Sequence, residues 1–432
     1  MASLTPSTPL NSAKTPIDQN QGTHRKLFAV LPDLFLEQSV IGLSLICLFN
    51  LPFSEAFKEI SLVGGMIASL LLLLEHRQTG RFFIRLLTVG WPVFLFVGVS
   101  FASGVHSINT FEGLRGAWGD LETLMGLILF STLLNVERSP GRIRKWMLMA
   151  ILSGTFSGAA VGLFRIWNEH RPFLGMMNLG DKNTTAQFLS FLFLIVFFFH
   201  SQKNRWNIPF SLFVVLYPIL AVFLFLTHSR TFLIAVPVAL LVMIAVLKWW
   251  KTLAVVGGFL FCLLVGTAVS PTLRWEVQTV IHPMSDGSFE SRYPTWEGAI
   301  RMWKAHPFLG VGPDNFHMPN IHSIYHLPDY AAHGHNVFFN LLGEYGALGV
   351  IAFFLWLTVW VKTAVSGLGS GRLPPASLAL CLGTMVNLLI GGIAHPMWGG
   401  STSLLLMLAM ALSLFPDPVL IENSPNPQGR IA

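Results

Sequence analysis

The sequence predicts an all-α fold: a polytopic bundle of about twelve transmembrane helices with one large extracytoplasmic loop that contains short helices. Of the 432 residues, 53% are hydrophobic and only 11% are charged, whereas soluble domains carry about 25% charged residues. Several stretches contain about 20 residues with almost no charge, which is the length that crosses a bilayer. The basic residues fall in short loops between these stretches, as membrane topology requires.

The apolar segments and the loops between them define the predicted organisation. The predicted spans are 34–51, 60–75, 84–102, 118–134, 146–166, 184–200, 208–227, 231–247, 252–270, 336–361, 376–393 and 400–415. Residues 1–26 are rich in Ser, Thr, Pro, Asn and Gln, a composition that predicts a disordered tail. We therefore expect the chain to divide into a tail (1–26), nine spans (27–270), a large loop (271–334), three spans (335–415) and a second tail (416–432).

The distribution of Lys and Arg predicts the orientation. If the N-terminus is cytoplasmic, the inside loops carry 15 Lys and Arg, and the short outside loops carry 6. Cytoplasmic loops are the ones that carry the excess. An even number of spans then places both termini in the cytoplasm and the loop 271–334 outside.

The composition also excludes several functions. The net charge of +6 is spread over loops rather than gathered on one face, so no nucleic-acid partner is expected. The three cysteines lie inside apolar segments without CxxC spacing, as buried small hydrophobes do. The chain contains no GxxxxGK[ST], HExxH, GxSxG or Asp-x-Asp motif, so we expect no ATP site, no metal and no cofactor. A reaction on the outer side must draw its energy from its own substrate.

One segment of the large loop predicts a short amphipathic helix. In PTWEGAIRMWKAHP, Pro294 suits the first turn and His306-Pro307 ends the helix. Trp296, Ile300 and Trp303 share one face, and charged residues occupy the other. Such a helix lies on the membrane interface or caps the bundle.

Three polar features stand at the predicted outer surface. They are Thr227-His228-Ser229-Arg230 at the end of a span, Glu290-Ser291-Arg292-Tyr293 before the amphipathic helix, and His333-Gly334-His335-Asn336 at the start of a span. Each alone has a plain structural explanation: a snorkelling arginine, a solvated loop and a helix start. Together, two arginines and a histidine suit a substrate with a diphosphate. One arginine side chain can bind two phosphate oxygens at once, and histidine can take a proton from a hydroxyl group.

Two glycines follow the third feature. On an uninterrupted helix, Gly346 lies on the same face as His335, roughly 16 Å further along, and Gly349 lies near that face. We expect this glycine groove to admit another helix or a lipid chain. Glu344 falls roughly opposite His335 and contacts another helix rather than orienting that histidine.

The run HGHN, followed after nine residues by GALG, resembles the His-[Asn/Ser/Gln]-x9-Gly-x-x-Gly motif of the O-antigen ligase family. SRYPTWEGAIRMWKAHPFLGVGPDNFH resembles the large periplasmic loop of that family, and THSR resembles its Ser-Arg helix start. The sequence departs from the family at Val350, where Gly, Thr or Tyr is more usual. The resemblance covers most of the chain through its topology, loop position and three motifs.

This resemblance implies an inverting, metal- and ATP-independent glycosyltransferase of the bacterial inner membrane. It would move a glycan from undecaprenyl diphosphate to a hydroxyl of the lipid A core. His335 matches the proposed base, and Arg230 and Arg292 match the arginines that hold the diphosphate. His333, Asn336, Arg171 and Lys182 are candidates for a supporting shell.

Alternatives stay open at this point. The same superfamily contains O-antigen polymerases and protein O-oligosaccharyltransferases, so the resemblance fixes the chemistry better than the acceptor. A transporter or flippase is a weaker alternative, because few charges lie within spans and no internal repeat is evident. A zinc site is another weak alternative, because one loop contains five histidines but no cysteine or HxxxH motif. These histidines are His317, His322, His326, His333 and His335.

Overall fold

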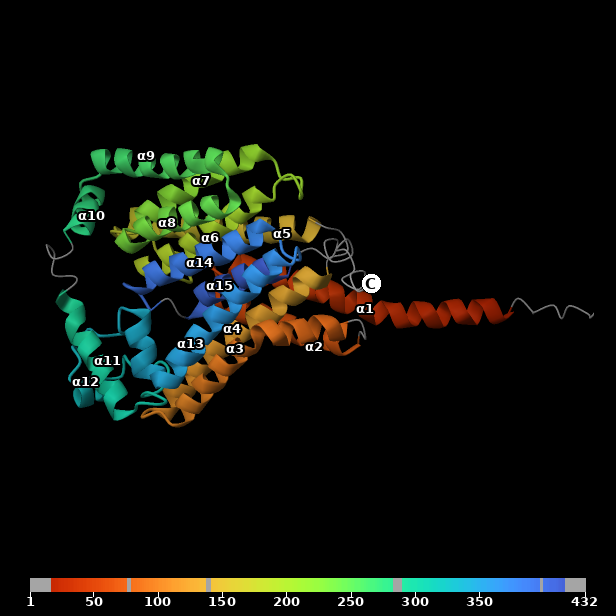
Figure 1. Ribbon diagram of the computed structural model, residues 1–432, viewed down its shortest axis with the longest axis horizontal. Helices are drawn as coiled ribbons and strands as arrows, with labels where there is room; N and C mark the ends of the chain where they lie inside the picture. Colours follow the sequence, from red (N-terminus) through yellow and green to blue (C-terminus); the bar gives the residue numbers. More distant parts are fainter. Residues whose placement is uncertain (1–16, 76–78, 137–140, 283–289, 397–398, 416–432) are drawn as a thin grey trace, which may run out of the picture.

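The computed structural model of the protein describes residues 17–75, 79–136, 141–282, 290–396 and 399–415 (Figure 1). Over these ranges it contains helices and no strand, which confirms the all-α prediction. The helices are α1 (Ile17–Asn50), α2 (Glu55–Glu75), α3 (Thr79–Val105), α4 (Thr110–Val136), α5 (Arg142–Glu169), α6 (Lys182–Ser201), α7 (Phe210–Leu226), α8 (Arg230–Leu247), η1 (Trp250–Thr252), α9 (Leu253–Val269), α10 (Pro271–Ile281), η2 (Glu290–Arg292), α11 (Tyr293–Ala305), α12 (Pro319–Tyr325), α13 (Val337–Gly369), α14 (Pro375–Gly392) and α15 (Gly400–Leu414).

This is a polytopic membrane protein. In the described part of the chain, eight helices are long and apolar enough to cross a bilayer: α2, α3, α4, α5, α6, α8, α13 and α14. A ninth span is counted if α9 and α10 are taken together, although they meet at 114°. Shorter apolar helices occupy Leu34–Asn50, Phe210–Leu226 and Gly400–Leu414. Every predicted span thus coincides with a helix, while the count of about twelve spans stays a prediction.

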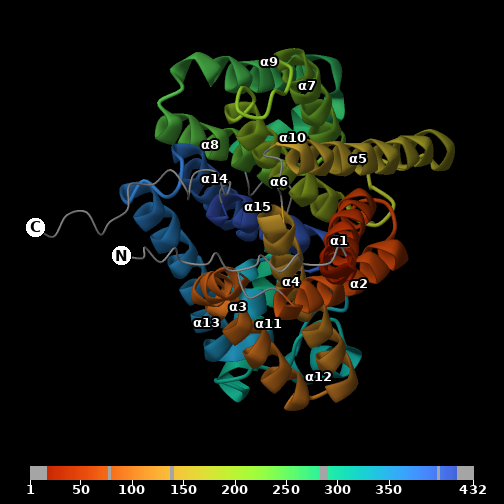
Figure 2. The ribbon, with the colours of Figure 1, turned by 90° about the vertical axis from the view of Figure 1, so that its right-hand side faces the viewer.

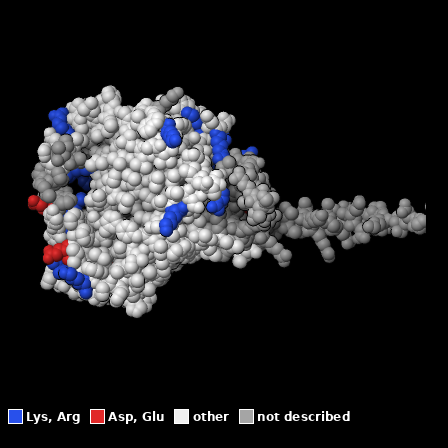
Figure 3. Space-filling model, in the orientation of Figure 1, with Lys and Arg blue, Asp and Glu red and all other residues white. Residues whose placement is uncertain are grey.

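Charged side chains gather at the two ends of the bundle. Figure 3 shows a broad uncharged band between them on the face drawn. Such a band is expected where lipid tails surround a protein, because a charge in hydrocarbon is costly. One end of the bundle carries α10, next to α9, and, apart from it, α11 and α12; the start of α1 projects from the opposite end (Figure 1). Figure 2 shows the bundle from the side of α1.

The structure describes only part of the predicted N-terminal tail and none of the predicted C-terminal tail. Helix α1 begins at Ile17, so residues 17–26 of the expected tail are helical in the structure, and the disorder of the tail stays a prediction. The segments 1–16 and 416–432 lie outside the described residues.

The amphipathic helix predicted in the large loop is present as α11. It packs on α13 through Thr295, Ala299 and Met302, which are buried. Trp296 of the predicted Trp-rich face also stacks on Phe339 of α13, with ring centres 5.3 Å apart. The close approach depends on Gly343 of α13, where an added Cβ would lie 3.2 Å from Met302 Sδ. Helix α11 therefore caps the bundle, the second of the two expected placements.

Helix α13 is not one continuous helix, contrary to the geometry assumed for its glycines. Gly346 has φ 65° and ψ −165°, which breaks the helix at that residue. The segment that follows α11 enters the break and forms four backbone hydrogen bonds there: Ala347 N to Pro307 O, Leu348 N to Phe308 O, Val311 N to Gly343 O and Gly312 N to Glu344 O. These bonds occupy backbone groups that a helix break would otherwise leave unpaired.

Candidate active site

The three residues singled out from separate sequence motifs line one cavity. Arg230, Arg292 and His335 surround a space of about 440 Å³, together with Lys182. They come from the first residue of α8, the end of η2, the turn before α13 and the first residue of α6. Residues more than a hundred positions apart in the chain are thereby brought to one place.

The start of α8 gives this cavity a positive end. Ser229 precedes the helix but makes no capping bond with its side chain; its Oγ instead donates to Asn183 Oδ1, at 2.9 Å. The Ser229 side chain therefore does not cap the first turn of α8, where Thr231 lines the cavity. Uncapped helix N-termini favour anions. The Arg230 guanidinium lies over the Trp275 ring, 5.0 Å from its centre, which positions its charge at the same end.

His335 lies in the turn just before α13, not on the helix. Its φ of 46° is left-handed, and its backbone N–H donates to His333 Nδ1 at 3.1 Å. The two imidazole rings meet edge to face, with centres 4.1 Å apart. Burial lowers the pKa of His335 to about 4, and nearby His333 and Arg292 act in the same direction. The ring is therefore neutral at physiological pH and can accept a proton.

The neighbours of His335 hold it in place. Asn336 is the N-cap of α13: its Oδ1 accepts hydrogen bonds from Phe338 N and Phe339 N, and its Nδ2 donates to Ile393 O. Burial also lowers the pKa of His333 to about 4. His333 and Asn336 thus both contact the turn that carries His335 or the helix start after it, and their supporting role stays a prediction.

Lys182 and Arg171, the two basic residues expected near His335, lie in different places. Lys182 lines the cavity. Arg171 lies in the turn after α5, and its Nε is 2.7 Å from Glu169 Oε2, both side chains being exposed. Arg171 therefore belongs to a surface ion pair.

The glycine groove expected below His335 is wrong. An added Cβ at Gly346 would lie 2.5 Å from the carbonyl of Phe308, so a loop backbone fills that space instead of a helix or lipid chain. At Gly349 an added Cβ would lie 2.2 Å from Tyr345 Cβ, within the same helix. Both glycines serve the break in α13, because only a residue without a side chain permits such close approach.

Glu344 contacts both another spanning helix, as expected, and the large loop: its backbone carbonyl accepts from Ser103 Oγ of α3 at 2.9 Å, and its side chain contacts the loop. Its Oε1 accepts from Phe316 N at 3.1 Å, and its Oε2 accepts from Asn340 Nδ2 at 2.8 Å. Asn340 Oδ1 in turn accepts from Gly334 N. This buried chain of hydrogen bonds connects the loop to the turn that carries His335, which helical spacing alone did not indicate.

Among the cavity residues that sequence reasoning missed is a histidine. His395 follows α14 and lines the same space as His335, although it is 60 positions away in the chain. Its ring centre lies 5.6 Å from that of His333. The sequence signal was a histidine at the predicted outer end of a span, the same criterion that had singled out Arg230.

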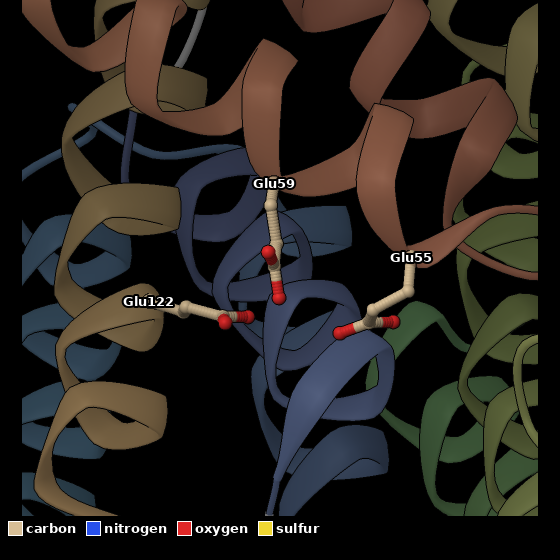
Figure 4. A group of neighbouring side chains, drawn as sticks. All are labelled: Glu55, Glu59 and Glu122. Atoms are coloured by element: carbon tan, nitrogen blue, oxygen red, sulfur yellow. The ribbon is translucent and has the colours of Figure 1, made fainter. Parts of the chain in front are cut away.

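Of the five loop histidines, His333 contacts His335, and the other three lie elsewhere. His317, His322 and His326 line a separate hollow of about 550 Å³, where His322 Nε2 lies within hydrogen-bond distance of two backbone carbonyls. In the described part of the chain, the group with metal-ligand spacing is Glu55, Glu59 and Glu122 (Figure 4). Lys58 Nζ contacts Glu55 and lies 3.0 Å from Glu122, so a lysine already supplies the positive charge there.

A larger cavity, of about 970 Å³, lies between α6, α7 and α9. Its walls are mostly aromatic and aliphatic, among them Phe193, Tyr217 and Phe259, with two lysines at one end. None of the predicted site residues lies there, so its size is not evidence of the active site.

Residues 216–354 match the sequence model of a family described as O-antigen ligase. The matched range contains Arg230, Arg292 and His335, but not Lys182 or His395. No curated protein matches the chain. The resemblance based on motifs is thus confirmed by an independent comparison.

Proposed function

We propose that this chain, whose residues 216–354 match the O-antigen ligase family, transfers a glycan from undecaprenyl diphosphate to a hydroxyl group of the lipid A core. The observation that carries the proposal is the convergence of Arg230, Arg292 and His335 on one cavity at the uncapped start of α8. Two guanidinium groups and a helix N-terminus suit a diphosphate. A neutral imidazole beside them suits the removal of a proton from a hydroxyl.

The reaction is a single displacement. Neutral His335 takes the proton of the acceptor hydroxyl as its oxygen attacks the anomeric carbon of the donor sugar. The bond between that carbon and the diphosphate oxygen breaks, and the electron pair leaves with the diphosphate. Arg230 and Arg292 stabilise the charge that develops on the leaving group, which is where fixed positive groups lower a barrier. One in-line attack inverts the anomeric carbon.

The proposal includes an orientation. The cavity opens on the periplasmic side of the bacterial inner membrane, and both termini face the cytoplasm. The cavity lies at the ends of α8, α13 and α14 nearest the segment 271–334, which the Lys and Arg distribution assigns to the outside. No nucleotide is needed there, because the glycosyl diphosphate bond supplies the energy.

The test is reconstitution of the purified protein with a lipid-linked glycan, in EDTA and without nucleotide. Three acceptors are supplied separately: lipid A core, a second lipid-linked glycan and a serine-containing protein. Glycosylated lipid A core is the expected product. Product on either other acceptor would replace the ligase by a polymerase or a protein transferase. No product on any acceptor, with the donor instead crossing the bilayer, would make the protein a flippase.

The base is tested by a matched pair of variants. His335 and His326 both have left-handed backbone, with φ 46° and 53°, and asparagine tolerates that conformation. His335→Asn removes the base without straining the turn, and we expect transfer to fall by about 10²–10⁴. His326→Asn lies in the other hollow and should transfer at the wild-type rate. Near-normal transfer by His335→Asn, at normal membrane levels, would remove His335 from the mechanism.

A further inference from the structure

His395 lies in the short turn that follows α14, at the wall of the cavity. The N–H groups of Ala394 and His395 both bond to Gly391 O, which fixes the turn. Asn336 Nδ2 donates to Ile393 O, which ties the turn to the start of α13. The turn that carries the ring is therefore tied both to α14 and to the start of α13, and His395 lines the cavity with Arg292 and His335.

The His395 ring is buried but incompletely paired. The residue is 7% exposed, and its Nδ1 has neither solvent contact nor a hydrogen-bond partner among the described residues. Burying an N–H donor without a partner costs more than burying an unused acceptor. The proton of the neutral ring therefore resides on Nε2, and since Nδ1 is enclosed, the Nε2 edge is the polar edge that can face the cavity.

The surroundings keep this ring uncharged. Burial lowers the pKa of His395 to about 4; Asp181 opposes the shift, and His335 and Arg292 add to it. The edge of the ring also faces His333. At physiological pH His395 thus offers one N–H donor and no charge to a cavity that already contains Lys182 and two arginines.

We propose that His395 is a third donor-binding residue, whose Nε2–H gives a hydrogen bond to a phosphate oxygen of the lipid-linked diphosphate. The choice of the lipid diphosphate as the ligand rests on the proposed function. The choice of His395 rests on its buried ring, whose Nδ1 has no hydrogen-bond partner among the described residues. A phosphate oxygen is the acceptor that the uncapped start of α8 and the two arginines select in this space. A neutral donor adds a bond there without adding a further charge.

The experiment measures binding rather than transfer. The full chain in nanodiscs is titrated with undecaprenyl diphosphate without a sugar, so that no reaction follows. Three variants separate the two ring nitrogens. His395→Gln places an amide N–H near the position of Nε2, His395→Asn places one near Nδ1, and His395→Phe keeps the ring without any N–H. The matched control is His200→Phe, a buried histidine of α6 that is 3% exposed and lines the other cavity.

We expect the Phe and Asn variants to bind the lipid diphosphate about 10-fold to 100-fold more weakly, as the loss of a hydrogen bond to a charged group predicts. The Gln variant should stay within about threefold of wild type, and His200→Phe should not change the Kd. Equal affinity of the Gln and Asn variants would overturn the assignment to Nε2, even if the Phe variant fails to fold. Unchanged affinity in all three, with an altered pH profile of transfer, would make His395 a positioning residue for His333 instead.

The two proposals fail differently. Wild-type protein that does not bind undecaprenyl diphosphate overturns both. Wild-type protein that binds and transfers, while His395→Phe binds equally well, overturns only the role of His395.

Discussion

Substitution of Gly346 by alanine is the most direct test of the break in α13. The residue has φ 65° and ψ −165°, a region that is essentially restricted to glycine and costs about 1–3 kcal/mol for other residues. The new Cβ would also lie 2.5 Å from the Phe308 carbonyl carbon and oxygen, and 2.7 Å from Gly310 N. These are backbone atoms, so the inserted loop must move.

The loss follows from the bonds that the loop makes. Four backbone hydrogen bonds join it to the break, and each contributes about 0.5–1.5 kcal/mol. Losing two of them, in addition to the strain, gives a destabilisation of about 2–6 kcal/mol. For a chain of this size that corresponds to a fall in Tm on the order of 2–7 °C.

The assay is thermal unfolding of the purified protein in detergent, followed by a thiol-reactive dye or by light scattering. The matched control is Gly98→Ala in α3, where nothing lies within 4 Å of an added Cβ and the helix should be unchanged or stabilised by up to about 1 kcal/mol. If Gly346→Ala and Gly98→Ala unfold within about 1 °C of each other, the contacts of the loop with the break in α13 do not stabilise the protein.

Three further predictions concern the site and the topology. Because the pKa of His335 is lowered to about 4, its neutral form persists well below the pH at which an ordinary histidine is protonated. We expect kcat/KM for transfer to stay level from pH 8 to about 5 and to fall near pH 4. A fall centred at about pH 6.5 would indicate a histidine with an unshifted pKa. Arg230→Lys and Arg292→Lys keep the charge but lose the paired N–H groups, so each should lower transfer by about 10-fold to 100-fold; wild-type rates in both would show that charge alone suffices. Reporter fusions at Lys145 should read as cytoplasmic and at Pro283 as periplasmic, and a cytoplasmic signal at Pro283 would reverse the orientation.

Much of this protein was determined by local sequence. Hydrophobic residues make up 53% of the chain, too many to be buried in the core of one water-soluble domain. This composition determined the class of fold. Helix α11 followed from Pro294 and the 3.6-residue pattern after it. The motifs around Arg230, Arg292 and His335 were recognisable because guanidinium and imidazole groups near span ends are costly and few, so each one needs a reason.

The tertiary structure decided how those pieces meet. Periodicity places residues on a face only while the helix continues, and no local pattern showed that Gly346 would leave the helical region; that depends on the loop backbone at Phe308, which enters the break. The same limit hid His395, because a turn after α14 meets a turn before α13 only through the packing of the whole bundle. Sequence thus determined which groups lie near the end of the bundle, and long-range packing determined which of them share a cavity.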